Sequence, residues 1–323
     1  MAASALLGGA GAYLAGSWLA AKALARLLIS PEGLEPVRER REDLLTRLRE
    51  SGASVVDFRY RGSRHDAVEL AAVFACPPPP EGRRPTVLFL HGKGGAAAEW
   101  RSEALRALAC GYAVLLPDLR AHGESRGEFF TYGLLEKDDL ANAIEAARER
   151  FGLDPARLGL HACSAGSFPA LEYASHSRGT RALWIESPYA DAREMARHYL
   201  SLWTGIPAGL LGLTSRWAVA SAFRQVRRQL DLPPETPGLE AVDPIHAIQR
   251  IEAPVCLVYG ERDELVPPRF VHRFEENLPP GSEIWKARNA GHCHHEDEPA
   301  KVATAEYDRR WKEFFGRHLP VDS

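Results

Sequence analysis

Six short apolar segments alternate with longer helical patterns through most of the chain, and this alternation constrains the fold more strongly than any other feature. The six segments are residues 86–90, 112–117, 158–162, 182–186, 255–259 and 283–287. Their continuous hydrophobicity is typical of strands that are buried on both faces of a parallel sheet. The sequence therefore predicts an α/β fold with a mostly parallel central sheet and helices on both faces.

Helices expected between the strands complete this pattern. The helical stretches are residues 96–108, 135–150, 167–175, 269–277 and 300–315. Ahead of the first apolar segment, residues 54–61 and 67–74 are predicted to form an antiparallel pair that starts the sheet. A charged helix is expected over residues 36–50, and the proline-rich residues 77–85 predict an exposed loop.

One interval, residues 188–247, breaks the alternation because it has helical patches but no convincing strand. The patches cover residues 192–203 and 215–230. The interval follows the sixth strand of the predicted sheet, so we expect a helical cap inserted there. Such a cap would lie over the carboxyl ends of the strands, where open α/β sheets bind ligands. Trp203 and Trp217 are its candidate pocket-lining residues.

Composition narrows the class of protein. The 323 residues are 45% hydrophobic, which is enough for a large core in one domain. A net charge of -3 argues against nucleic acid as the main partner. The five cysteines are odd in number and spread through the chain, as expected for a protein of a reducing compartment.

The N-terminal residues 2–21 carry no charged side chain, and a helix of this length could cross the apolar core of a bilayer. The basic residues that follow favour an uncleaved anchor with the folded body on the cytoplasmic side. The alternative is a buried or amphipathic helix of a soluble cytoplasmic protein. On this basis the chain divides into a hydrophobic helix (residues 1–29), a charged connecting helix (30–53) and one folded domain that includes the cap (54–323).

The segment that ends at Ser164 has the pattern of a tight turn from a strand into a helix. Ala162 and Gly166 lie two positions to either side of this serine, where only very small residues fit against neighbouring main chain. Such a turn presents a serine as a nucleophile at the end of a strand. Because Ser, Ala and Gly are common, the frame alone is a weak signal, and the interpretation depends on what else the chain supplies.

A serine nucleophile needs a base, and the base needs an acid that orients it. Asp263 follows the strand predicted at residues 255–259, and His292 follows the strand predicted at residues 283–287. The chain therefore supplies nucleophile, acid and base in that order, each at the carboxyl end of a strand. Glu186, which ends an earlier strand, is the alternative acid.

Two further loops resemble those of the α/β-hydrolase superfamily. Residues 91–95, His-Gly-Lys-Gly-Gly, directly follow a strand. Residues 117–125 are similar to the superfamily's Asp-x-Arg-Gly-His-Gly-x-Ser signature, with Ala121 in place of the usual glycine. The resemblance covers residues of about 54–318. It is best to membrane-anchored serine hydrolases of the esterase and serine-aminopeptidase-like type, which share Asp-Glu-Leu-Val-Pro beginning at the acid, here residues 263–267.

This resemblance implies roles for residues outside the triad. The backbone N–H groups of Lys93 and Ala165 would stabilise the oxyanion, and such donors contribute as much to catalysis as the triad does. His91 and Gly92 would line the substrate pocket. In relatives the signature at residues 117–125 is structural, so its aspartate and histidine are not expected to be catalytic.

The activity that the resemblance implies is a serine hydrolase that cleaves a carboxylic ester, thioester or amide through an acyl-enzyme, without a cofactor or a metal ion. The triad would be Ser164, Asp263 and His292. Its substrate would be a small-molecule or lipid-like ester or amide. Residues 2–21 would associate with the membrane. Two alternatives remain open, which are an acyltransferase with the same triad and a non-catalytic binding protein on the same fold.

Overall fold

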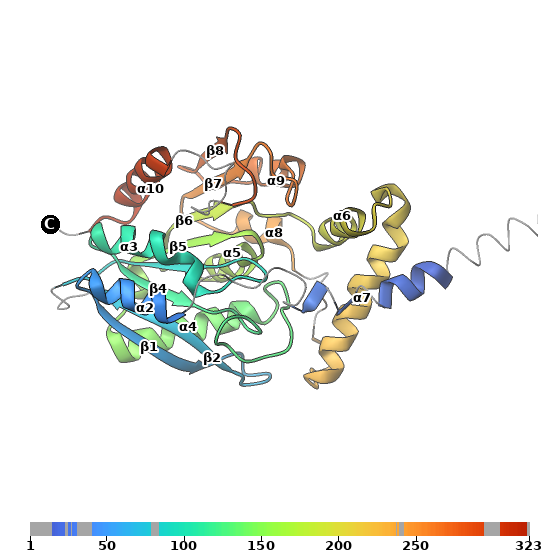
Figure 1. The fold of residues 1–323 in the computed structure, drawn as a ribbon, viewed down its shortest axis with the longest axis horizontal. Coiled ribbons are helices and arrows are strands. Elements are labelled where there is room, and N and C mark those ends of the chain that lie inside the picture. The colour runs from blue at the N-terminus through green and yellow to red at the C-terminus, as the bar shows by residue number, and fades with distance from the viewer. Residues whose placement is uncertain are drawn as a thin grey trace, which may run out of the picture.

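The computed structural model describes residues 15–22, 25–26, 28–30, 41–78, 84–236, 238, 242–293 and 304–321. Over these residues the chain forms an eight-stranded sheet in the order β1-β2-β4-β3-β5-β6-β7-β8. Helices cover both faces of the sheet (Figure 1). The predicted mostly parallel α/β architecture is therefore confirmed.

Every predicted strand is present, with ends displaced by at most two residues. The strands are β1 (Ser54–Arg61), β2 (Glu69–Cys76), β3 (Thr86–Leu90), β4 (Ala113–Pro117), β5 (Leu158–Cys163), β6 (Thr180–Glu186), β7 (Val255–Gly260) and β8 (Glu283–Ala287). β1 pairs antiparallel with β2, and β2 with β4, whereas all later pairs are parallel. The carboxyl ends of the parallel strands lie at one edge of the sheet, and the loops that carry the candidate catalytic residues begin there.

Helices pack on both faces of the sheet, because successive residues of a strand point to opposite faces and each face of these strands is apolar. In β3, Leu88 and Leu90 belong to one core cluster, and Val87 and Phe89 belong to the other. The first cluster is covered by α4 (Glu136–Phe151), α5 (Ser167–His176), α8 (Pro244–Gln249) and α9 (Pro268–Glu275). The second is covered by α2 (Arg41–Glu50), α3 (Arg101–Ala109) and α10 (Thr304–His318).

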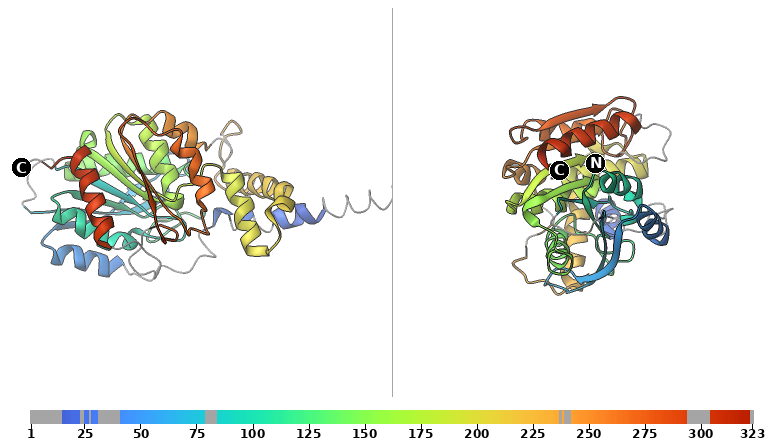
Figure 2. Two further views of the ribbon diagram at one scale, coloured as in Figure 1. Left: turned by 90° about the horizontal axis from the view of Figure 1, so that it is seen from above. Right: turned by 90° about the vertical axis from the view of Figure 1, so that its left-hand side faces the viewer.

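The predicted cap lies between β6 and β7. It consists of α6 (Ala192–Thr204), the short η4 (Ala208–Leu211) and α7 (Gly212–Gln229). Asp191 begins α6 by accepting hydrogen bonds from the backbone N–H groups of Arg193 and Glu194, at 2.7 and 2.9 Å. Gly205 ends the helix in the left-handed region. The cap lies at one end of the molecule, away from the C-terminus (Figure 2).

Residues of the N-terminal segment pack into the main core beside the cap. Ala21, Ala25, Leu28 and Ile29 are buried there. The carbonyl of Ile29 accepts a hydrogen bond from the backbone N–H of Phe130 at 2.7 Å. This segment therefore shares a core with the folded domain.

The predicted N-terminal anchor is only partly described, because residues 2–14 lie outside the described ranges. Within those ranges, no helix combines the length and the apolar character that crossing a bilayer requires.

Candidate active site

Ser164 occupies a strained turn between β5 and α5. Its φ is +48°, in the left-handed region that residues with a side chain rarely adopt. An ideal Cβ placed on Gly166 would lie 2.4 Å from the carbonyl oxygen of His91 and 2.7 Å from that of Leu90. Only a glycine fits this approach, which explains the small residue that the sequence places two positions after the serine.

The loop after β3 lies directly beside this turn. An ideal Cβ on Gly92 would lie 3.2 Å from the Cβ of Ser164. Gly92 and Ser164 therefore lie close together. The two predicted oxyanion donors directly follow them in the chain, Lys93 after Gly92 and the buried Ala165 after Ser164. Burial also lowers the pKa of the Lys93 ammonium group to about 8.

His91 is a core residue that fixes the conformation of this loop. Its side chain is completely buried. Nε2 accepts a hydrogen bond from the backbone N–H of Leu119 at 3.0 Å, and Nδ1 donates to the carbonyl of Gly92 at 2.8 Å. Burial lowers the pKa of His91 to about 4, which keeps the ring neutral near pH 7. Contact with a substrate, as predicted for a pocket residue, would require this buried ring to become accessible.

Asp118, the first polar residue of the signature loop, ties three segments together. Its carboxylate accepts hydrogen bonds from the backbone N–H of Ala97 at 2.7 Å, from that of Glu124 at 2.9 Å, and from Arg41 Nη1 at 2.6 Å. The aspartate is buried beneath the loop. These contacts fit the structural role that the resemblance implied. Ala121 in the same loop has a φ of +63°, where relatives carry a glycine.

Asp263 and His292 meet beyond the ends of β7 and β8. His292 Nδ1 lies 2.9 Å from Asp263 Oδ2, and Asp263 Oδ1 accepts a hydrogen bond from the backbone N–H of Val266 at 2.7 Å. The aspartate is 3% exposed. A carboxylate on Nδ1 favours the tautomer whose Nε2 can accept a proton. Two of the three predicted catalytic side chains are therefore in direct contact.

Ser164 is buried at the elbow, and no hydrogen bond joins its Oγ to His292 among the described residues. Free hydrolases often make this contact only when a substrate is bound. The neighbouring His294 and His295 lie outside the described residues.

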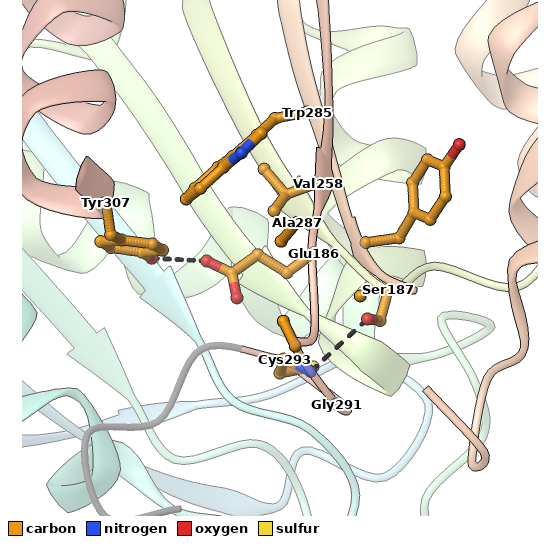
Figure 3. A pocket seen from close by; sticks show the side chains of 11 residues that line it. Glu186, Ser187, Val258, Trp285, Ala287, Gly291, Cys293 and Tyr307 are labelled. Carbon is orange, nitrogen blue, oxygen red and sulfur yellow. Dashed lines mark hydrogen bonds between the residues drawn. The ribbon is translucent and has the colours of Figure 1, made fainter. Parts of the chain in front are cut away.

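Glu186, the alternative acid, has its own buried partners. It accepts hydrogen bonds from Trp184 Nε1 at 2.8 Å, from His161 Nε2 at 3.0 Å and from the hydroxyl of Tyr307. Glu186 and Tyr307 border a cavity of about 20 Å³ between β6, β7 and β8 (Figure 3). The imidazole of His292 is bonded to Asp263 instead.

Ser187 is a site neighbour that the sequence analysis did not identify. It directly follows β6 with a φ of +46°, and its hydroxyl accepts a hydrogen bond from the backbone N–H of Cys293 at 3.5 Å (Figure 3). It thereby links the end of β6 to the loop that carries His292. The one signal in the sequence was the Ser-Pro pair directly after a predicted strand.

The cap is held to the loop that carries Asp263. His198 on α6 lies with Nε2 2.8 Å from the carbonyl oxygen of Glu264, the residue after Asp263. Met195 and Tyr199, on the same helix, help to line a small apolar cavity where the cap meets the N-terminal segment. The sequence analysis missed both, although their spacing of four residues is that of a buried helix face.

The two cap residues predicted to line the pocket lie elsewhere on the cap. Trp203 stacks on Tyr199, with ring centroids 5.7 Å apart, but is itself 47% exposed. Trp217 is half-buried and packs against the main core. Neither residue lines the apolar cavity, so their contact with substrate stays a prediction.

The sheet topology, the cap after β6 and the strained serine turn together define an α/β-hydrolase architecture. A sequence model described as the alpha/beta hydrolase family matches residues 87–305, and the chain belongs to this family.

One curated relative is an uncharacterized protein of Bacillus subtilis, 28% identical over 190 residues. That alignment covers 58% of this chain and 57% of the relative, so the chain spans little more than half the relative's length.

Solved structures share the fold over most of the chain. An esterase of Pyrococcus furiosus superposes with a TM-score of 0.65 at 21% identity, covering 90% of this chain and 98% of the esterase. An acylaminoacyl peptidase of Pyrococcus horikoshii gives a TM-score of 0.58 at 18% identity, covering 84% of this chain and 42% of the peptidase. At these identities the similarity establishes the fold.

Proposed function

We propose that the protein is a serine hydrolase that cleaves a carboxylic ester, thioester or amide. Ser164 attacks the carbonyl carbon while His292 Nε2 accepts its proton, and the same imidazole then returns the proton to the leaving group. Asp263 holds the imidazole in the required tautomer and stabilises its protonated form. A water molecule then attacks the acyl-enzyme while His292 accepts its proton, and the imidazole returns this proton to Ser164 as the acid product leaves.

The contact between Asp263 and His292 is the observation that carries this proposal. Buried aspartates are costly unless their charge is paired or hydrogen-bonded. Here one carboxylate oxygen accepts a backbone N–H and the other faces the imidazole. The pair lies at the same edge of the sheet as Ser164, where a nucleophile in a strained turn would be used.

The oxyanion would be stabilised by the backbone N–H groups of Lys93 and Ala165. The tight approach of the loop after β3 to Ser164 supports this assignment. Removing one such donor in a hydrolase costs about 3 kcal/mol of transition-state stabilisation. No cofactor is required for this chemistry.

Both ester and amide substrates fit the mechanism, and the structural neighbours include an esterase and a peptidase. We propose a small-molecule or lipid-like substrate, because the cap faces the N-terminal segment with apolar side chains, although the cavity between them is only about 10 Å³ and would have to open to admit a substrate. A panel of p-nitrophenyl esters of increasing acyl length would rank these substrates.

The decisive experiment labels the full-length protein with a fluorophosphonate probe, in the parent and in Ser164→Ala. We expect labelling and ester turnover in the parent, and the loss of both in the variant. Ser167→Ala is the matched control, because this serine lies one helical turn further along the chain and is also buried. Labelling that persists in folded Ser164→Ala, or that is absent from the folded parent, would exclude the assigned nucleophile.

A further inference from the structure

The exposed apolar side chains of this protein are concentrated at one place. Seven large hydrophobic side chains are exposed among the described residues, and six of them belong to the N-terminal helix and the cap. We call these six the cap-tip surface, which consists of Trp18, Leu19, Leu202, Trp203, Ile206 and Leu210. The N-terminal helix and the cap lie together at one end of the molecule (Figures 1 and 2).

These side chains are exposed although their own elements are well packed. On the N-terminal helix, Ser17 and Ala21 face the protein, whereas Trp18 and Leu19 face outward. On the cap, buried Leu200 is followed by a stretch from residue 202 to 210 that is mostly exposed. Exposed apolar side chains that gather at one end of a protein normally mark an interaction site.

Charge identifies the kind of partner. Residues 198–215 carry no Asp, Glu, Lys or Arg, and Arg197 and Arg216 lie at the two ends of this stretch. Residues 192–230 hold six arginines and one glutamate, in a chain whose net charge is -3. The apolar tip is therefore flanked by Arg197 and Arg216, on two helices that carry four further arginines along their length.

The N-terminal helix repeats the same arrangement. The ammonium group of Lys22 lies 3.8 Å from the centroid of the exposed Trp18 ring. A tryptophan at the level of lipid headgroups, with a basic side chain beside it, is the usual arrangement at a membrane interface.

We propose that the cap-tip surface docks on an anionic lipid bilayer. Its apolar side chains would enter the boundary between headgroups and acyl chains, and the flanking arginines would pair with lipid phosphates. A second copy of this chain is a poorer partner, because association through the same surface would bring two arginine-rich caps together. This docking is peripheral, and it does not depend on the proposed hydrolysis.

The test is flotation of the full-length protein with phosphatidylcholine vesicles, with and without phosphatidylglycerol. We expect binding to the anionic vesicles that weakens as salt is added. The combined variant Leu202→Ser, Ile206→Ser, Leu210→Ser should bind anionic vesicles at least about tenfold more weakly than the parent does. Ile284→Ser is the matched control, because Ile284 is 48% exposed, like Leu202 at 49%, but lies on β8.

A second pair of variants tests the charge. Arg216→Glu should weaken binding to anionic vesicles, whereas Arg178→Glu, an equal charge change at an exposed site outside the cap, should leave it nearly unchanged. Thermal unfolding verifies that each variant is folded, so the result stands whether or not the protein hydrolyses esters.

Binding by the triple variant at the level of the parent, or no binding by the parent, would overturn the proposal. So would light scattering that shows a parent dimer, dissociated by the triple variant, with no affinity for vesicles. That last result would assign the cap-tip surface to a second copy of the chain.

Discussion

Asp263 Oδ2 lies 2.9 Å from His292 Nδ1, although 29 positions separate the two residues in the chain. The contact exists because β7 and β8 are neighbouring parallel strands, so the loops that follow them begin at the same edge of the sheet. Glu186, at the end of β6 in the same sheet, is bonded to His161, Trp184 and Tyr307.

Asp263→Asn should lower kcat for ester hydrolysis by about 1000-fold or more, because an amide cannot hold the tautomer in which His292 Nε2 accepts a proton. Glu186→Gln is the control, and should reduce thermal stability while retaining most of the activity at a temperature where it is folded. Steady-state kinetics on a soluble ester measure both. A larger loss of kcat in folded Glu186→Gln than in Asp263→Asn would reverse the assignment of the acid.

Stability should fall as the pH is lowered from about 6.5 to about 4, in part because of His91. The folded protein holds this ring neutral, whereas the unfolded chain takes up a proton below about pH 6.5. For His91 alone, the free energy of unfolding at pH 5 should be about 2 kcal/mol lower than at pH 7. Urea unfolding of the parent and of His91→Gln at the two pH values measures this difference.

His91→Gln removes the titrating group, so its stability should change less between pH 7 and pH 5 than that of the parent. The comparison uses the pH dependence, which is separate from any constant loss that the substitution causes. An identical pH dependence in the two proteins would show that His91 is not neutral and buried in the folded state.

Ala121→Gly should stabilise the protein by about 0.5 to 1 kcal/mol. Ala121 has a φ of +63°, and this conformation costs a residue with a Cβ about 1 kcal/mol or more. Part of the gain is offset because glycine increases the entropy of the unfolded chain. Ala208→Gly, at a position without a positive φ, should destabilise slightly, and equal effects in urea unfolding would argue against strain at residue 121.

Gly166→Ala should destabilise the protein by about 3 kcal/mol and abolish ester turnover, because the new methyl group would collide with the carbonyl oxygens of Leu90 and His91. Gly209→Ala is the control, since an ideal Cβ there meets no atom within 4 Å. Thermal unfolding and the ester assay measure the effects. A folded, fully active Gly166→Ala variant would contradict the tight elbow.

Much of the fold could be predicted because its signals are local. Burial on both faces makes each parallel strand a continuous apolar run, and in the helices between the strands apolar residues recur every three or four positions. Residues 183–186 and 255–258, for example, form neighbouring strands whose identity was evident although their pairing was not. The ends of the helices were predicted less well than their presence. Helix α7 begins at Gly212, three residues before the predicted start.

The sequence by itself determined the tight turn at Ser164 and the order in which Ser164, Asp263 and His292 follow their strands, because a tight turn admits only small residues and each of these polar residues comes after an apolar strand. Only the tertiary structure decided that His292 faces Asp263, and that His91 supports a loop from within the core. It also decided that Met195 and Tyr199 line the cavity beneath the cap. These outcomes depend on packing between segments distant in the chain, and local sequence patterns carry no record of such contacts.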